Sequence, residues 1–218
     1  MRLRFRLSKN TSIVPFDYQH HLIGAFHQML GWNEIHNAIS LYSLSWLQGG
    51  RIAKTGFNYE QGSEWLVSIW DDEIAKKLIS GALSQFELFF GMKIVEIGIQ
   101  PTPIFSNHQR FVPASPIFIR KYDENKKAIH LLYDNPESDF FLTEAMKKKL
   151  KTVGLDYEIK IEFDRSYPKP KTKLVHINNI ASRASMCPVI IEGDPKAVEF
   201  SWNVGVGHST GSGFGAIY

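Results

Sequence analysis

The stretch from residue 205 to residue 218 concentrates the residues best suited to binding a phosphate. It holds five glycines, and four of them form two Gly-apolar-Gly brackets, Gly205-Val206-Gly207 and Gly213-Phe214-Gly215. Glycine reaches positive φ at little cost and lets another backbone come close. Two brackets around a short polar insert therefore predict a loop whose N–H groups converge on one point, and such a nest binds anions, phosphate above all. The plainer interpretation is a glycine-rich hairpin turn.

Two better-known glycine motifs do not fit this stretch. A Walker loop requires Gly-x-x-x-x-Gly-Lys-Ser/Thr, and no lysine follows these glycines. A dinucleotide fingerprint requires Gly-x-Gly-x-x-Gly at the start of a helix, but position 210 is Thr and too few residues follow for that helix. We therefore do not expect a nucleotide-cofactor site here.

The pattern Gly-Val-Gly, five residues, Gly-Phe-Gly resembles the glycine-rich signature of the RAMP superfamily, and in particular of its CRISPR repeat-RNA processing endoribonucleases. Residues 14–24, Val-Pro-Phe-Asp-Tyr-Gln-His-His-Leu-Ile-Gly, are similar to the first helix of these enzymes, and residues 186–195 also resemble the family. Relatives usually carry Lys or Arg in the five-residue insert, whereas here it is His-Ser-Thr-Gly-Ser. The resemblance touches both halves of the chain.

This resemblance implies a specific reaction. It implies metal-independent cleavage of CRISPR repeat transcripts into guide RNAs, with no cofactor, leaving a 2′,3′-cyclic phosphate and a 5′-hydroxyl. The implied partners are repeat RNA and either a second copy of the chain or the subunits of a CRISPR effector complex, with no membrane. The alternative is a catalytically inactive RAMP subunit that only holds guide RNA.

Histidine suits the acid and base roles of that reaction because its pKa lies near neutrality. His36 is the leading candidate, since it lies in the loop after the first predicted helix, where the family commonly places its catalytic histidine. His27 is the second, because it aligns with a tyrosine that some relatives use. A solvated loop histidine and a histidine packed on the flank of a helix are the respective alternatives.

A third catalytic group stays open, because no lysine lies between His36 and Arg51. Its candidates are Ser40, Tyr42, Ser43, Arg51 and Lys54. For RNA binding, we predict contacts from the glycine-rich loop and from basic side chains, each of which could instead be a solvated charge: Gly205, Gly207, His208, Gly213, Gly215, Lys54, Lys173 and Arg183.

Composition indicates an ordinary globular protein of 218 residues, with 44% hydrophobic and 22% charged residues. The formal charge of +3 argues only weakly for a polyanionic partner. Cys187 is the single cysteine, so an internal disulfide and a zinc site of the Cys–His type are excluded. Residues 2–7 alternate Arg with Leu or Phe and lack the continuous apolar core of a signal peptide, so we expect a cytoplasmic setting.

Hydrophobic periodicity predicts the elements that position these residues. In the first half it indicates strands at 2–7, 41–47, 65–69 and 92–100, a helix ending at Gly31, a helix from Asp71 or Asp72 to Gly91, and a polar connection at 51–62. In the second half it indicates a hairpin within 111–133, a helix from Thr143 to Gly154, and strands at 157–163, 173–177, 188–191 and 198–202.

In each half of the chain, the order of elements is typical of a ferredoxin-like unit, whose sheet is a common platform for single-stranded RNA. We therefore expect an α+β protein of tandem ferredoxin-like (RRM-like) domains with a C-terminal glycine-rich loop. The expected limits are 1–100 for the first domain, 101–112 for a linker and 113–218 for the second domain. Arg2, Arg4 and Arg6 should share the outer face of the first strand, either solvated or against RNA phosphates.

Overall fold

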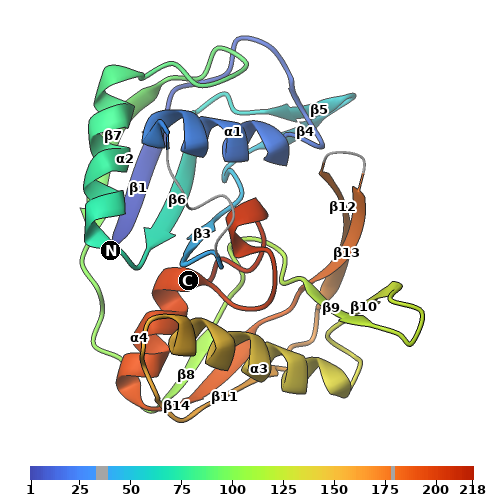
Figure 1. Cartoon of the computed structure of the whole chain (residues 1–218). Coiled ribbons are helices and arrows are strands. Elements are labelled where there is room, and N and C mark those ends of the chain that lie inside the picture. Colours follow the sequence, from blue (N-terminus) through green and yellow to red (C-terminus); the bar gives the residue numbers. More distant parts are fainter. Residues whose placement is uncertain (33–38, 178–179) are drawn as a thin grey trace.

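Two antiparallel sheets, one in each half of the chain, organise the protein in the computed structural model, which describes residues 1–32, 39–177 and 180–218 (Figure 1). His36, the leading catalytic candidate, lies outside the described residues. In Figure 1 the N-terminal half, in blue and green, lies above the C-terminal half, in yellow and red. Trp70, at the end of the first sheet, packs edge-on against Phe200 of the second half, with ring centroids 4.8 Å apart.

The first half has the ferredoxin-like order of elements. Its sheet runs β3-β6-β1-β7, and all neighbouring strands pair antiparallel. Helices follow the first and third strands in the chain. The six elements are β1 (Arg2–Leu7), α1 (Gln19–Leu30), β3 (Tyr42–Leu44), β6 (Ser63–Ile69), α2 (Asp72–Ser84) and β7 (Ile94–Gln100).

The second half repeats this plan with a shortened fourth strand. Its sheet runs β11-β14-β8, and Ile217 pairs with Pro113 beyond β8, where the fourth strand of the first half would lie. The five elements are β8 (His108–Phe111), α3 (Glu137–Thr152), β11 (Ile159–Phe163), β14 (Val189–Gly193) and α4 (Pro195–Val204). The prediction of tandem ferredoxin-like domains is therefore confirmed.

Three hairpin additions project from these two units. The first joins β4 (Arg51–Ala53) to β5 (Gly56–Asn58), which also pairs with β2 (Val14–Pro15). The others join β9 (Ile119–Tyr122) to β10 (Ala128–Leu131), and β12 (Lys171–Ile177) to β13 (Ile180–Met186). The glycine-rich loop follows α4 and contains the short 3-10 helix η2 (Thr210–Ser212). Residues 51–62, predicted as a polar connection, thus contain the first hairpin.

Alternation in β1 buries one face of the strand but does not leave all three arginines outside. Leu3, Phe5 and Leu7 enter the first core as predicted. Arg4 and Arg6 face solvent beside glutamates of the neighbouring strands, whereas Arg2 is 1% exposed. Arg2 thus shares the face of Arg4 and Arg6, but the prediction that it is solvated or in contact with RNA phosphates is wrong, because the second half of the chain covers this end of the strand.

The guanidinium of Arg2 joins the two halves. It donates to Ser68 Oγ at 2.6 Å, to the Trp202 carbonyl at 2.9 Å and to the Ile217 carbonyl at 2.7 Å. The same group lies 3.6 Å from the centroid of the Trp202 ring. Burial lowers the pKa of Arg2 to about 9, and three strong acceptors compensate for the lost hydration.

Several predicted elements differ in kind or length from those observed: α3 begins at Glu137 rather than at Thr143, and β3 covers Tyr42–Leu44 rather than 41–47. Residues 198–202, predicted as a strand, lie inside α4, because Pro195 occupies the first turn and the Asp194 carboxylate caps the Lys196 N–H. Asp71 caps α2 as predicted, but the helix ends at Ser84 rather than near Gly91, and Phe86 is exposed.

Strand β8 (His108–Phe111) lies within the segment predicted as a linker, residues 101–112. It pairs with β14 from Phe111↔Val189 to His108↔Glu192, so these four residues extend the second sheet. The domain limits themselves stay a prediction. Within the described ranges, no helix is both long and apolar enough to cross a membrane.

Candidate functional site

The glycine-rich loop lies at the junction of the two halves, where η2 contacts α1 and β3 (Figure 1). Most of its main-chain N–H groups are used inside the protein. Those of Gly205, Val206 and Gly215 donate to the carbonyls of Ser201, Gly215 and Pro116, and those of His208 and Gly213 donate to Phe118 and Thr210. These N–H groups hold the loop together and are not available for the amide nest predicted from composition, and phosphate binding by the other N–H groups of the loop stays a prediction.

The glycines instead permit close approach. A Cβ at Gly205 would lie 2.7 Å from Ser43 Cβ, and one at Gly207 would lie 2.6 Å from the Phe118 carbonyl oxygen. Both glycines have φ above +70°, a region that disfavours any residue with a Cβ. A Cβ at Gly211 would lie 2.5 Å from Ser40 Oγ. The loop is thereby packed tightly onto the segment that leads into β3.

His27 and the glycine-rich loop both pack against Tyr42. The rings of His27 and Tyr42 are edge-on with centroids 6.5 Å apart, and Phe26 stacks on Tyr42 at 4.5 Å. Gly211 packs against the Tyr42 hydroxyl. The fold thus brings the second histidine candidate to the loop. His36 precedes Ser40 by four residues in the sequence.

The five candidates for the third catalytic group separate into three environments. Ser40 and Tyr42 share a hydrogen bond at the loop, and burial raises the pKa of the Tyr42 phenol, which therefore stays protonated at neutral pH. Ser43 is fully buried against Gly205. Arg51 and Lys54 are exposed in the first hairpin, and Arg51 lies 3.6 Å from Glu60. Ser40, Tyr42 and Ser43 therefore lie at the glycine-rich loop, whereas Arg51 and Lys54 lie in the hairpin.

His208, in the insert of the loop, is an uncharged hydrogen-bonding group at neutral pH. Burial lowers its pKa to about 4, and the charges of Arg120, Lys149 and Lys148 act in the same direction. Its Nδ1 accepts from the Arg120 N–H at 3.1 Å, so Nε2 carries the proton. The half-buried ring can therefore donate to a phosphate oxygen without being charged.

His130 on β10 repeats this arrangement, which the sequence analysis missed. Its Nδ1 accepts from the Arg183 N–H at 3.1 Å, and burial together with Arg120 and Arg183 lowers its pKa. The ring also lies edge-on to Phe118, with centroids 5.1 Å apart. Two neutral imidazoles and two arginines thus border the same side of the C-terminal half. A histidine within an alternating strand carried no signal that distinguished it from a surface residue.

Lys173 and Arg183, both predicted to bind RNA, lie on opposite faces of the β12–β13 ribbon. Arg183 pairs across the strands with Leu174, and successive side chains of a strand alternate between faces. Lys173 therefore shares its face with Val175 rather than with Arg183. The two side chains are exposed but do not converge on one phosphate.

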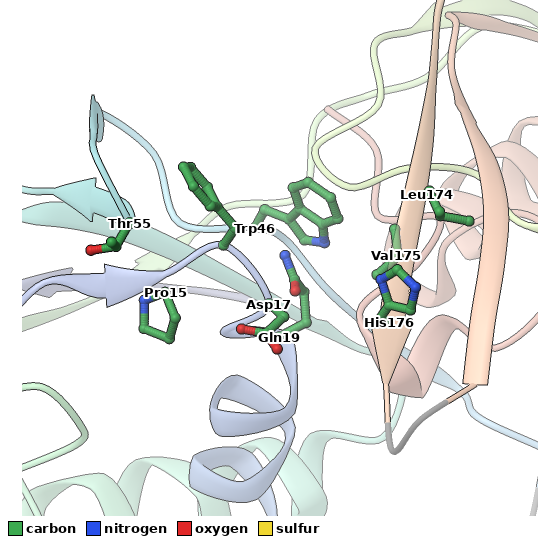
Figure 2. A pocket seen from close by; sticks show the side chains of 9 residues that line it. Pro15, Asp17, Gln19, Trp46, Thr55, Leu174, Val175 and His176 are labelled. Atoms are coloured by element: carbon green, nitrogen blue, oxygen red, sulfur yellow. The ribbon is translucent and has the colours of Figure 1, made fainter.

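A cavity of about 250 Å³ separates the start of α1 from β12 (Figure 2). Figure 2 shows Gln19 and Trp46 from the first half facing Val175 and His176 from the second. Trp46 also donates from Nε1 to the Gly213 carbonyl at 3.0 Å, which links the cavity to the glycine-rich loop. In the sequence, Lys54 precedes the lining residue Thr55 and Lys173 precedes Leu174, but neither lysine lines the cavity. Aromatic and amide groups suit contact with a nucleobase.

Lys149 on α3 is the second group that sequence reasoning missed. It is 5% exposed, and its ammonium group bonds to the glycine-rich loop. A signal was present, since Lys149 falls between Met146 and Leu150 on the apolar face of the predicted helix. In the ranges that the structure describes, no three His, Cys, Asp or Glu side chains gather as a metal-binding group.

Residues 99–218 match the family model described as CRISPR associated protein Cas6, C-terminal, and these residues are more than half of the chain. The chain belongs to the Cas6 family. The resemblance of the glycine-rich segment to CRISPR-associated RAMP proteins is thereby confirmed. In this Cas6 chain the glycine-rich loop lies inside the matched segment, and both catalytic candidates precede it.

Solved Cas6 structures share the fold over the whole chain. A Cas6-related protein from Pyrococcus furiosus superposes with a TM-score of 0.88 at 20% identity, covering 100% of this chain and 97% of that one. A CRISPR associated protein Cas6 superposes with a TM-score of 0.84 at 22% identity, covering 100% of this chain and 98% of that one. A RAMP protein binding different RNA substrates superposes with a TM-score of 0.84 at 19% identity, again covering 100% of this chain and 98% of that one. No curated protein sequence matches the chain.

Proposed function

We propose that this Cas6 chain is a metal-independent endoribonuclease that cleaves CRISPR repeat transcripts into guide RNAs. The observation that carries the proposal is the meeting of His27, Tyr42 and the glycine-rich loop at the junction of the two halves. Family membership supports repeat RNA as the substrate. The solved RAMP protein that binds different RNA substrates has the same fold.

In the proposed reaction, the 2′-hydroxyl of one nucleotide attacks the adjacent phosphorus in line, and the 5′-oxygen of the next nucleotide leaves. His36 takes the proton of the attacking hydroxyl or supplies one to the leaving oxygen, and His27 is its partner. The products are a 2′,3′-cyclic phosphate and a 5′-hydroxyl. Each positioned acid or base typically contributes ~10²–10⁴-fold.

We propose distinct contributions from the residues around these histidines. Tyr42 is 5% exposed and bonded to Ser40, so it orients the His27 ring rather than contacting RNA. His208 of the loop, together with Arg120 and Arg183, contacts phosphates on one side of the C-terminal half. The cavity in Figure 2 takes a base of the bound strand, and the exposed Lys54 and Lys173, each next in sequence to a lining residue, contact its phosphates.

The experiment incubates the protein with repeat RNA in EDTA and compares substrates with 2′-hydroxyl or 2′-deoxy sugar at the cut. We expect cleavage of the ribose substrate only, with a cyclic phosphate end. His36→Ala and His27→Ala should each lower the rate ~100-fold or more. His108→Ala is the matched control, because His108 is an exposed histidine on β8 paired with Glu192. Cleavage of the deoxy substrate would contradict the mechanism.

The alternative is a guide-RNA-binding subunit without nuclease activity. The insert His208-Ser209-Thr210-Gly211-Ser212 favours it, because it offers no lysine or arginine to stabilise the charge of the transition state. Such a subunit would bind repeat RNA with equal affinity before and after His36→Ala and would release no product from either.

A further inference from the structure

The buried ammonium group of Lys149 has three N–H bonds and three acceptors. It donates to the Val204 carbonyl at 3.1 Å, to the Gly205 carbonyl at 3.2 Å and to Thr210 Oγ1 at 3.0 Å. Val204 is the last residue of α4 and Gly205 follows it, so both carbonyls lie at the C-terminal end of the helix, where the helix dipole favours a positive charge. A single side chain from α3 therefore holds both the end of α4 and the loop that follows it.

These bonds determine the direction in which the Thr210 hydroxyl donates. Because Thr210 Oγ1 accepts from Lys149, its own proton is free for another acceptor. That acceptor is the Ser40 carbonyl, 3.5 Å away at the approach to β3. The next loop residue, Gly211, packs against Ser40 and Tyr42. The relay, meaning the hydrogen bonds from Lys149 to Thr210 and from Thr210 to Ser40, thus reaches residues 40–42 at the candidate site.

We propose that Lys149 is a positioning residue for RNA cleavage, which acts by fixing the Thr210 hydroxyl as a donor to the Ser40 carbonyl and so setting the glycine-rich loop against Tyr42. The proposal rests on the proposed function for its effect on catalysis. Its structural part, the coupling of Lys149 to residues 40–44, stands without that function.

The charge state of Lys149 would control this relay. Burial lowers the pKa of Lys149 to about 7. The charge of Lys149 acts on His208 of the loop, and Arg120 on β9 and Lys148 on α3 act on the same imidazole, while Tyr42 on β3 lies beyond Gly211. A neutral amine has two N–H bonds and one lone pair. The Thr210 hydroxyl can then turn to donate to Nζ, and its bond to Ser40 is lost.

The first test measures amide hydrogen exchange in the full chain without RNA. Lys149→Met and Thr210→Val should each speed exchange in residues 39–44 and 205–213 about tenfold, while the two sheets keep their protection. Thr210→Ser retains the hydroxyl and should restore slow exchange. Lys151→Met is the matched control, because Lys151 is exposed on the same helix, and it should exchange as the wild type does. Unchanged exchange in residues 39–44 of both Lys149→Met and Thr210→Val would overturn the proposal.

The second test follows cleavage of repeat RNA against pH. Lys149→Met and Thr210→Val should lower kcat about tenfold and leave KM within about twofold. Wild type and Thr210→Ser should share a decline in kcat as pH rises through 7 that Thr210→Val lacks. Equal pH profiles for wild type and Thr210→Val would overturn the role in catalysis. A wild type that cleaves no RNA would instead refute the proposed function, and the exchange measurement would still decide the coupling.

Discussion

Gly211 lies against the phenol of Tyr42 so closely that a Cβ at position 211 would be 2.7 Å from the Tyr42 hydroxyl oxygen. One residue comes from the C-terminal loop and the other from the second strand of the first sheet. Because the His27 ring also packs edge-on to Tyr42, we expect a shift of the phenol to move the candidate histidine. The contact therefore couples the two halves at the site.

Gly211→Ala should lower RNA cleavage more than it lowers stability. The added methyl group displaces the ends of two side chains, Ser40 and Tyr42, rather than any backbone atom, so we expect the melting temperature to change little. We expect kcat to fall about tenfold. Single-turnover cleavage and thermal unfolding measure the two effects. Gly24→Ala, with open space around the new methyl group on α1, is the control. Full activity of Gly211→Ala would show that Tyr42 does not orient the site.

Gly215→Ala, in contrast to Gly211→Ala, should cause a large loss of stability. A Cβ there would overlap the Val206 carbonyl oxygen, and its φ of +65° disfavours alanine. The same residue bonds to Val206 and to Pro116 through its main chain. We expect the free energy of unfolding in urea to fall by about 3 kcal/mol or more. A loss below about 0.5 kcal/mol would contradict the packing of the loop described here.

Arg2→Met and Arg4→Met make a matched pair on one strand. Arg2→Met leaves the buried carbonyls of Trp202 and Ile217 without their donor, which should lower the free energy of unfolding by about 2–4 kcal/mol. Arg4 is exposed and forms a surface ion pair with Glu64, so its replacement should leave unfolding unchanged within error. Denaturation of both variants in urea provides the comparison, and equal losses would refute the joining role of Arg2.

Acid should destabilise the protein partly through His208. Its pKa is lowered from 6.5 to about 4, so between these values the unfolded chain binds more protons than the folded one. Stability therefore falls as pH falls from 6.5 to 4, by about 1–3 kcal/mol from this group. His208→Gln removes this contribution, because an amide does not titrate. Urea unfolding at several pH values tests it, and parallel curves for wild type and variant would contradict it.

Much of the fold follows from local patterns in the sequence. Alternation in β1 and the Asp71 cap of α2 were recognised because each signal lies within a few neighbouring residues. The strand predicted at 198–202 fails for a related reason. A short apolar segment fits both the strand and the helix period, and the decisive signal was the helix start at Asp194-Pro195, about one turn earlier.

The site was less accessible to sequence reasoning because it depends on contacts between distant segments. The glycine spacing correctly located a loop between the halves, but not the internal use of its N–H groups, which requires partners such as Ser201 and Phe118. The Lys149 contacts with Thr210 span 61 residues, and no local pattern reports them. His36 stays a prediction, since it lies outside the described residues.

The bond between Arg2 and Ile217 joins positions 215 residues apart. During translation, the first strand therefore leaves the ribosome long before the carbonyls that its guanidinium needs have been synthesised. Until then this cation must remain hydrated, which keeps that end of the nascent sheet open to water. Docking of the two halves therefore waits for residues 202–217, because the buried charge of Arg2 has its carbonyl acceptors there.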